Sequence, residues 1–327
     1  MYDYGLSTLE QYGLDAESTA RIRGALLCRT EKGPVIIKEF KGTEKKLQKQ
    51  QELLVRIKEQ GGYTDCYIPN QEENLVSRDK DGISYTLQYW YEGRECDTRS
   101  KEDIFRSIRT LAEMHQRMHM PVVDFYLEPS LENEYQRHNQ EMKKIRSFIR
   151  KRGPSGMFEK LYLETVEKFL QDGEEAHAAL MDSGYQALRQ KAEKDGEVCH
   201  GEYNQHNVLM LKNGTAVTSF DHWGFDTQMA DLYRFMRKIL EKYNWDIRLG
   251  KEMIRVYHQI KPISEEEWTN LEIRFSYPEK YWKLANYYYT HRKTLISAKN
   301  TEKLQNLIHQ RDAWKRYCTS FLGKTGV

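Results

Sequence analysis

Strand-like patterns are concentrated in the first 93 residues of this chain. Residues 20–40 hold two apolar runs separated by "TEKG", a turn-forming cluster that predicts an antiparallel hairpin. Two further strand-like runs lie around "ENLVS" and in "ISYTLQYWYEG", and the second of them ends at Gly93. Between these pairs, "TEKKLQKQQELLVRIKEQGG" places Leu47, Leu54 and Ile57 at helical spacing and stops at two glycines. A small mixed sheet with one helix is therefore predicted for this part.

Beyond that point the pattern becomes mainly helical. Ile104, Ile108, Leu111 and His115 follow one another at intervals of four, three and four residues, which places them on one face of a helix. We interpret His115 as a core histidine with no chemical role. Strands that precede helices in this way predict an α+β fold. We expect two lobes, residues 1–93 and residues 94–327.

The composition excludes several classes of protein. Apolar residues make up 39% and charged residues 31% of the chain, which is typical of a folded protein rather than a disordered one. The 51 basic and 49 acidic residues leave a net charge of +2, so no global field favours nucleic acid. No window approaches the roughly 18 apolar residues of a membrane span. Five scattered cysteines without a CxxC pair indicate reduced thiols in a reducing compartment. Without a membrane span or a signal-peptide pattern, we expect the protein in the cytoplasm.

A dense group of polar side chains occurs in "HGEYNQHN", residues 200–207. The apolar run after it turns at "KNG" and returns to Asp221, so a hairpin should bring Glu202, Asn207 and Asp221 together at one end. Phosphoryl transfer from ATP uses such a set: a carboxylate orients the attacking hydroxyl, and an amide oxygen with a second carboxylate holds Mg²⁺. Lys38, at the end of a strand, would steady the phosphates.

Each of these residues also has a simpler interpretation. His200, Glu202 and His206 could form a capped turn, and Lys38 could be an exposed lysine at a strand end. We interpret His206 as structural rather than as a metal ligand, because Mg²⁺ prefers oxygen. A carboxylate on the helix should pair with Lys38, and its two candidates are Glu44, in the first turn, and Glu52, which we favour.

Several motifs together resemble one superfamily. "HGEYNQHN" resembles the H-G-D-x-x-x-x-N catalytic loop of the aminoglycoside phosphotransferase and choline kinase branch of the protein-kinase-like fold, with Glu202 and Asn207 at the acidic and amide positions. "FDHW" resembles the segment with the metal-binding Asp, at Asp221, and "VIIKEF" the strand with the phosphate-contacting lysine, at Lys38. "LAEMH" is similar to a helix of the same fold. The resemblance implies a bilobal kinase-like fold with ATP and Mg²⁺ as cofactors.

Within that superfamily the longer strings "HGEYNQHNV", "FDHWGFDTQMADLYRFMRKILEKYNWD" and "YPEKYWKLANYYYTHRK" are similar to CotS-type spore coat proteins. The family implies a sporulation-associated bacterial protein, with partners in the spore coat and location in the cytoplasm or the coat. It also implies that a buried Asp231 and His200 support the loop. Asp231 could instead cap its own helix.

Two departures from the superfamily pattern bear on activity. The loop carries Glu202 where Asp is usual, which lengthens the side chain by one methylene. A complete G-x-G-x-x-G loop is missing from the hairpin, which argues against a protein kinase more than against ATP. The sequence therefore predicts a phosphotransferase that acts on a hydroxyl of a small molecule or saccharide, with a catalytically silent coat scaffold as the alternative.

The aromatic stretch at residues 275–293 has two interpretations. Its tyrosines and tryptophan could form ordinary helical core, or they could form a wall of the acceptor pocket by stacking on sugars. In the second case Lys280, Lys283 and Arg292 could meet anions.

Overall fold

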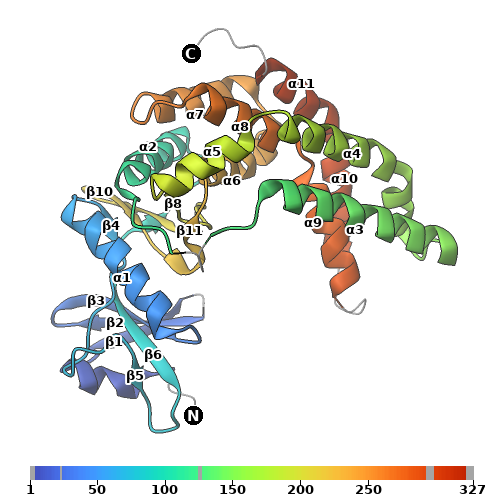
Figure 1. Ribbon diagram of the computed structural model, residues 1–327. Helices are drawn as coiled ribbons and strands as arrows, with labels where there is room; N and C mark the ends of the chain where they lie inside the picture. The colour runs from blue at the N-terminus through green and yellow to red at the C-terminus, as the bar shows by residue number, and fades with distance from the viewer. Residues whose placement is uncertain (1–3, 23, 124–126, 292–297, 322–327) are drawn as a thin grey trace. The chain divides into compact units, whose positions relative to one another are not determined.

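The computed structural model describes residues 4–22, 24–123, 127–291 and 298–321. The chain divides into two compact units (Figure 1). The first combines Met1–Pro121 with His200–Trp223, and the second combines Val122–Cys199 with Gly224–Val327. The larger sheets lie in the first unit and most helices in the second, which confirms the α+β class. The first unit extends past residue 93 and recruits a distant segment, and a lobe boundary at residue 93 stays a prediction.

An antiparallel five-stranded sheet forms the N-terminal part of the first unit. The predicted hairpin is present, and one more strand precedes it. Val35 and Ile37 face a core that includes Leu9 and Tyr12 of the short helix η1 (Leu6–Tyr12). Because side chains alternate along a strand, Ile36 and Lys38 point to the opposite face. In spatial order the strands are β1 (Ser18–Ile22), β2 (Ala25–Thr30), β3 (Gly33–Glu39), β6 (Ser84–Tyr89) and β5 (Ser77–Arg78).

The predicted helix is α1 (Glu44–Glu59). Thr43 caps its first turn by accepting a hydrogen bond from the Lys46 amide at 3.4 Å. The Gln51 side chain fixes α1 to the chain after β4, since it donates to the Tyr67 carbonyl at 3.0 Å and accepts from the Tyr67 amide at 2.8 Å. The side chains that α1 buries are Leu47, Gln50, Leu53, Leu54 and Ile57.

A second sheet of four short strands completes the first unit. Its strand β10 pairs in parallel with β4 and antiparallel with β9, so segments far apart in the sequence lie side by side. The helix α2 (Lys101–Arg117) lies against β10, and Arg106 donates to the Thr215 hydroxyl and the Leu211 carbonyl at 3.0 and 3.1 Å. His115 is buried in α2. In spatial order the strands are β4 (Tyr63–Thr64), β10 (Gly214–Val217), β9 (Val208–Leu211) and β7 (Arg94–Glu95).

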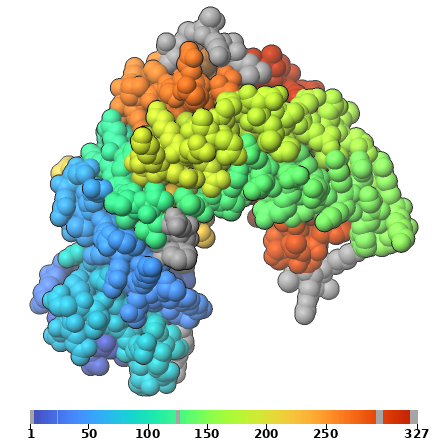
Figure 2. Space-filling model, in the orientation of Figure 1, coloured from blue at the N-terminus to red at the C-terminus, as the bar shows by residue number. Residues whose placement is uncertain are grey.

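Helices dominate the second unit. The two longest, α3 and α4, pack side by side (Figure 2). Buried Asp172 in α4 joins Arg311 and Lys315 of the last helix, at 2.8 Å to each. The helices are α3 (Leu131–Arg152), α4 (Met157–Met181), α5 (Tyr185–Lys194), α6 (Met229–Lys242), α7 (Ile247–His258), α8 (Glu265–Ser276), α9 (Glu279–Thr290), α10 (Ala298–His309) and α11 (Arg311–Phe321), with the ribbon β8 (Val198–Cys199) and β11 (Gly224–Phe225).

Buried His138 in α3 should make the protein less stable in acid. Its ring stacks on Trp282 with the centroids 3.3 Å apart, and burial lowers its pKa from 6.5 to about 4. The unfolded chain takes up this proton near pH 6.5 and the folded chain only near pH 4. The free energy of unfolding should therefore fall as the pH drops through that window, by up to about 3 kcal/mol.

Urea unfolding at pH 7 and pH 4.5 measures this effect, and His138→Phe, which keeps an aromatic ring in the stack, is the comparison. The variant should lose less stability than the wild type between the two pH values. The same loss in both proteins would contradict the assignment to His138.

Two features bear on the environment of the protein. All five cysteines are free and buried. Within the described ranges, no helix is both long and apolar enough to cross a bilayer.

Candidate active site

Residues 200–207 form a loop that is tied to the end of β10 by His200. The Nδ1 atom of this buried histidine accepts a hydrogen bond from the Glu202 amide at 3.1 Å. The proton therefore sits on Nε2, which donates to the Thr218 carbonyl at 3.0 Å. His200 thus connects the start of the loop to the strand that leads to Asp221.

Gly201 lets the loop pass close to the segment that follows β10. Its φ is +79°, and a Cβ atom at this position would lie 1.8 Å from the His222 carbonyl oxygen. Any other residue would have to push the two segments apart. The glycine in the "HGE" motif is therefore required by the backbone geometry.

Two amide side chains shape the rest of the loop. Asn204 and Asn207 each donate from Nδ2 to the Glu202 carbonyl, at 2.9 and 3.0 Å. The Asn207 carbonyl accepts from the Thr218 amide at 2.9 Å, which joins the loop to the hairpin. Since the Asn207 nitrogen is committed to Glu202, its Oδ1 is the atom that can serve a ligand.

Asp221 lies in the short helix η3 (Phe220–His222), which begins directly after a residue in an unusual backbone conformation. Ser219 has φ +67°, a left-handed conformation that is uncommon for residues other than glycine. Its amide donates to Oδ2 of Asp65 at 2.9 Å, which holds the turn. Oδ2 of Asp221 then lies 3.6 Å from Nζ of Lys38.

The loop and the turn before Asp221 contribute to the lining of one cavity of about 570 Å³, and every residue of this lining belongs to the first unit. Four of the residues that the sequence singled out are brought together here: Lys38, Glu202, Asn207 and Asp221. The side chain of Glu202 is 51% exposed, with Oε2 3.7 Å from Nε2 of His222. The rest of the lining is Ile22, Gly24, Ala25, Ile36, Glu39, Lys41, Trp90, Asn204, His206 and Ser219.

Glu52 is not brought to Lys38. It is exposed on α1, and its carboxylate lies 2.7 Å from Nζ of Lys49. Glu44, in the first turn of α1, is exposed as well. His206 lines the cavity, and its Nδ1 contacts Glu95 at 2.6 Å.

Asp231 belongs to the second unit, where it is fully buried in the first turn of α6. The N-cap position of α6 is Gln228, so the interpretation of Asp231 as a capping residue is wrong. Support of the loop at residues 200–207 by Asp231 stays a prediction.

Asp65 is a member of this site that the sequence analysis missed. It follows β4 directly and is fully buried, with one oxygen on Ser219. The pKa of Asp65 is raised to about 6, mainly by burial and also by the charge of Asp221, while the positive charge of Lys38 acts to lower it. The only local signal is an acidic residue between "GGYT" and "CYIP", where no periodic pattern draws attention to it.

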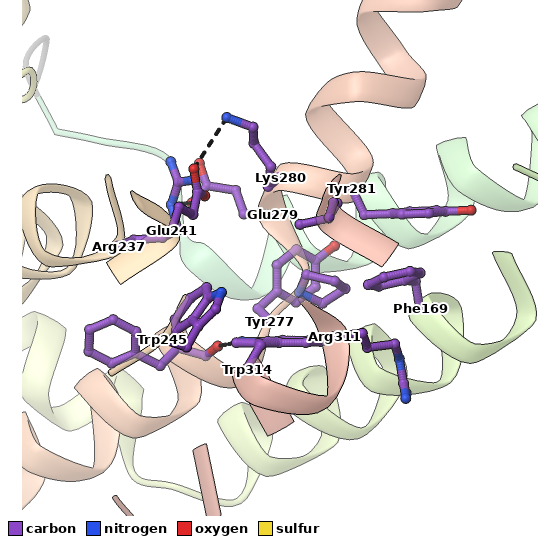
Figure 3. A pocket seen from close by; sticks show the side chains of 13 residues that line it. Phe169, Arg237, Glu241, Trp245, Tyr277, Glu279, Lys280, Tyr281, Arg311 and Trp314 are labelled. Carbon is purple, nitrogen blue, oxygen red and sulfur yellow. Dashed lines mark hydrogen bonds and ion pairs between the residues drawn. The ribbon is translucent and has the colours of Figure 1, made fainter. Parts of the chain in front are cut away.

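The described part of the aromatic stretch, residues 275–291, mostly packs into the second unit. Tyr277 stacks on Tyr135 with the ring centroids 3.6 Å apart, and the ring of Tyr281 lies 4.1 Å from that of Phe169. Tyr277 and Tyr281 also line a cavity in which Lys280 pairs with Glu241 (Figure 3). Its volume of about 20 Å³ has room for a water molecule and for no acceptor.

Two of the three positively charged residues singled out in this stretch form ion pairs: Lys280 with Glu241, as above, and Lys283 with a glutamate of its own helix. Lys283 contacts Glu279. Arg292 lies outside the described residues. An anion-binding role for these side chains stays a prediction.

The solved structures with the same fold include a phosphotransferase and a kinase that are named for small molecules. An aminoglycoside phosphotransferase from Alicyclobacillus acidocaldarius subsp. acidocaldarius DSM 446 is 17% identical, with a TM-score of 0.86 over 96% of this chain and 94% of that one. The amicoumacin kinase hAmiN, solved with AMP-PNP, Ca²⁺ and Ami, is 12% identical, with a TM-score of 0.60 over 96% and 94%. The kinase-like fold expected from the sequence is confirmed.

The sequence comparisons point to the spore coat. Spore coat protein S of Bacillus subtilis (strain 168) is 24% identical over 157 residues. That match spans 47% of this chain and only 45% of the relative. A family model described as "Spore coat putative kinase YutH" matches residues 7–321, which is nearly the whole chain. The resemblance to CotS-type proteins is thereby confirmed, and the chain belongs to this spore coat kinase-like family.

Proposed function

We propose that this protein is an ATP- and Mg²⁺-dependent phosphotransferase that acts on a hydroxyl group of a small molecule or a saccharide. The observation that carries the proposal is the single cavity that brings Lys38, Glu202, Asn207 and Asp221 together. A cation, a carboxylate near the acceptor and two oxygen ligands are the parts that phosphoryl transfer requires.

The nucleotide would enter between the apolar and the charged part of the cavity. Ile22, Ala25, Ile36 and Trp90 supply flat and aliphatic surface for a base. Lys38 has a mostly buried side chain, and its ammonium group would contact the phosphates. The presence of AMP-PNP in the structure of the similar amicoumacin kinase supports nucleotide binding.

The donor set suits a hard divalent cation. Oδ1 of Asn207 and the carboxylate of Asp221 are oxygen ligands of the kind that Mg²⁺ prefers, and phosphate oxygens would complete the coordination. Bound Mg²⁺ would neutralise charge on the phosphates. In the described geometry Lys38 pairs with Asp221, so this carboxylate would exchange its ammonium partner for the metal.

Glu202 would act at the acceptor. Its carboxylate is half exposed, so it can reach a hydroxyl that enters from solvent. As the hydroxyl oxygen bonds to the γ-phosphorus, the bond from that phosphorus to the ADP oxygen breaks, and Glu202 orients or accepts the released proton. His200 and Gly201 would fix the backbone from which Glu202 projects.

A catalytically silent component of the spore coat is the second candidate. Two observations favour it: Glu202 replaces the usual Asp, and the family is a spore coat family. A displacement of about 1 Å at a reacting group can cost on the order of 10²-fold in rate. As a scaffold, the protein would bind other coat proteins rather than ATP.

Calorimetry of the purified protein with ATP separates the two candidates. The phosphotransferase should bind ATP in the presence of Mg²⁺ and much more weakly in EDTA. If ATP gives no heat of binding either with Mg²⁺ or in EDTA, the scaffold is favoured.

Lys38→Ala should weaken the binding of Mg·ATP by about tenfold, because it removes a cation from the phosphates. Lys32→Ala is the matched control, since Lys32 is an exposed lysine in the turn between β2 and β3, outside the cavity. Calorimetric titration of both variants measures the difference. Equal affinities of the two variants would remove Lys38 from the phosphate site.

A further inference from the structure

We propose that Asp65 positions Lys38 in the nucleotide site, in the place that the sequence pattern assigned to a carboxylate of helix α1. This inference rests on the proposed function for its consequence in nucleotide binding. The energetic coupling between the two groups is testable without a nucleotide.

The backbone fixes Asp65 next to Ser219, which lines the cavity. It follows β4, whose residue Thr64 is in parallel register with Val217 of β10. Its main-chain carbonyl accepts a hydrogen bond from the Gln88 side chain at 2.7 Å. Two strands of different sheets therefore hold this residue, and its side chain has no exposed surface.

Only one carboxylate oxygen of Asp65 is used by the backbone. Oδ2 accepts from the amide of Ser219, two residues before Asp221. Oδ1 is buried, and none of the described residues gives it a hydrogen bond. A buried carboxylate oxygen without a donor is unfavourable, so this atom requires a nearby positive charge.

Lys38 supplies that charge. In the register of β3 and β6, Lys38 and Gln88 lie on the same face of the sheet, and Gln88 donates to the Asp65 carbonyl from that face. The positive charge of Lys38 accordingly lowers the pKa of Asp65 against the effect of burial. The Lys38 side chain is only 21% exposed, and its Nζ lies 3.6 Å from Asp221 on the cavity side. The ammonium group thus has Asp221 on one side and the free oxygen of Asp65 within range of its field.

Helix α1 has no carboxylate that could do the same. All of its residues are described, and its buried face carries four aliphatic side chains and the uncharged Gln50. Glu52 is exposed and pairs with Lys49. When a metal ion engages Asp221, Asp65 is therefore the anion that keeps Lys38 directed at the phosphates.

A simpler role for Asp65 is to hold only the Ser219 turn. Asp65→Asn separates the two roles, because an amide oxygen still accepts from the Ser219 amide while the negative charge is lost. A double-mutant cycle with Lys38→Ala then reports whether the two side chains act together. Glu52→Gln, which makes the same chemical change at the rival position, is the control.

The first measurement is calorimetric affinity for AMP-PNP with Mg²⁺. Asp65→Asn should weaken binding by about fivefold to tenfold in the wild-type background and by less than twofold in the Lys38→Ala background. Glu52→Gln should bind as the wild type does. Equal factors in both backgrounds, or an Asp65→Asn variant with wild-type affinity, would overturn the proposal.

The second measurement is urea unfolding of the ligand-free proteins. The unfolding constant of the double variant should differ by at least fivefold from the product of the single effects. If the wild type binds no nucleotide but this coupling is present, the pair stands and the proposed function fails. Absence of coupling in unfolding overturns the pair whatever the nucleotide result.

Asp65→Glu replaces Asp65→Asn in both cycles if the asparagine variant does not fold. It keeps the charge and moves the carboxylate by one methylene, so it should misdirect Lys38. The same criterion applies: its effect on affinity must be smaller in the Lys38→Ala background, and an effect of equal size contradicts the proposal.

Discussion

Glu202→Gln should lower phosphoryl transfer by on the order of 10²-fold or more while Mg·ATP affinity stays near the wild-type value. The amide has the same size as the carboxylate but neither takes nor orients the hydroxyl proton. The side chain of Glu202 makes no hydrogen bond of its own to the loop, whose shape depends on the Glu202 backbone, so the fold should be unaffected. Release of ADP measures turnover, and calorimetry measures affinity.

Glu31→Gln is the matched control, because Glu31 is exposed in the turn after β2 and outside the cavity. It should change neither quantity. A Glu202→Gln variant that turns over ATP as fast as the wild type would contradict the assignment of Glu202 to the acceptor.

Glu202→Asp tests whether the longer side chain suits this particular loop. Retained or higher turnover would mean that the additional methylene has shifted an otherwise intact site. Lower turnover would mean that the backbone around Gly201 has adapted to Glu. A wild type without turnover, together with no gain in Glu202→Asp across sugars, aminoglycosides and choline-like alcohols, would favour the coat scaffold.

Asp221→Ala should abolish metal-dependent nucleotide binding, with a loss of at least about 10²-fold in affinity for Mg·ATP. The variant removes a charged metal ligand, and charge-assisted contacts of this kind are strong in a partly enclosed site. The side chain is 55% exposed, and among the described residues it forms an ion pair with Lys38 alone, at 3.6 Å, so the stability of the fold should change little.

Calorimetric titration of the variant with ATP, in Mg²⁺ and in EDTA, tests this prediction. Asp81→Ala, which removes an exposed carboxylate from the turn before β6, should leave both titrations unchanged. A folded Asp221→Ala variant with unchanged Mg²⁺ dependence would exclude Asp221 as a metal ligand.

The parts of the site that could be predicted are those encoded within a short stretch of chain. The hairpin of β9 and β10 follows from two apolar runs and "KNG", and it brings Asn207 to Thr218 and Asp221. Lys38 was predictable because "VIIK" ends a strand of a hairpin, and strand alternation places Lys38 opposite the buried Ile37.

Asp65 was not predictable, because it meets Ser219 across 154 positions of sequence. The spacing of apolar residues along a helix or a strand gives no information about a contact over such a distance in sequence. The exposure of Glu52, in contrast, was available from helical geometry. Glu52 is two residues from Leu54, about 200° around the helix axis, so it lies on the side opposite the buried face.

The discontinuous construction of the first unit also determines when the site can form during synthesis. Strands β4 and β7 have β10 and β9 as their sheet neighbours, and these come from His200–Trp223. At 5–20 residues per second, a ribosome needs roughly 4 to 16 s to translate the intervening Val122–Cys199. A nascent chain can form the five-stranded sheet during that interval, but its nucleotide site stays incomplete and two short strand edges stay unpaired until the hairpin emerges.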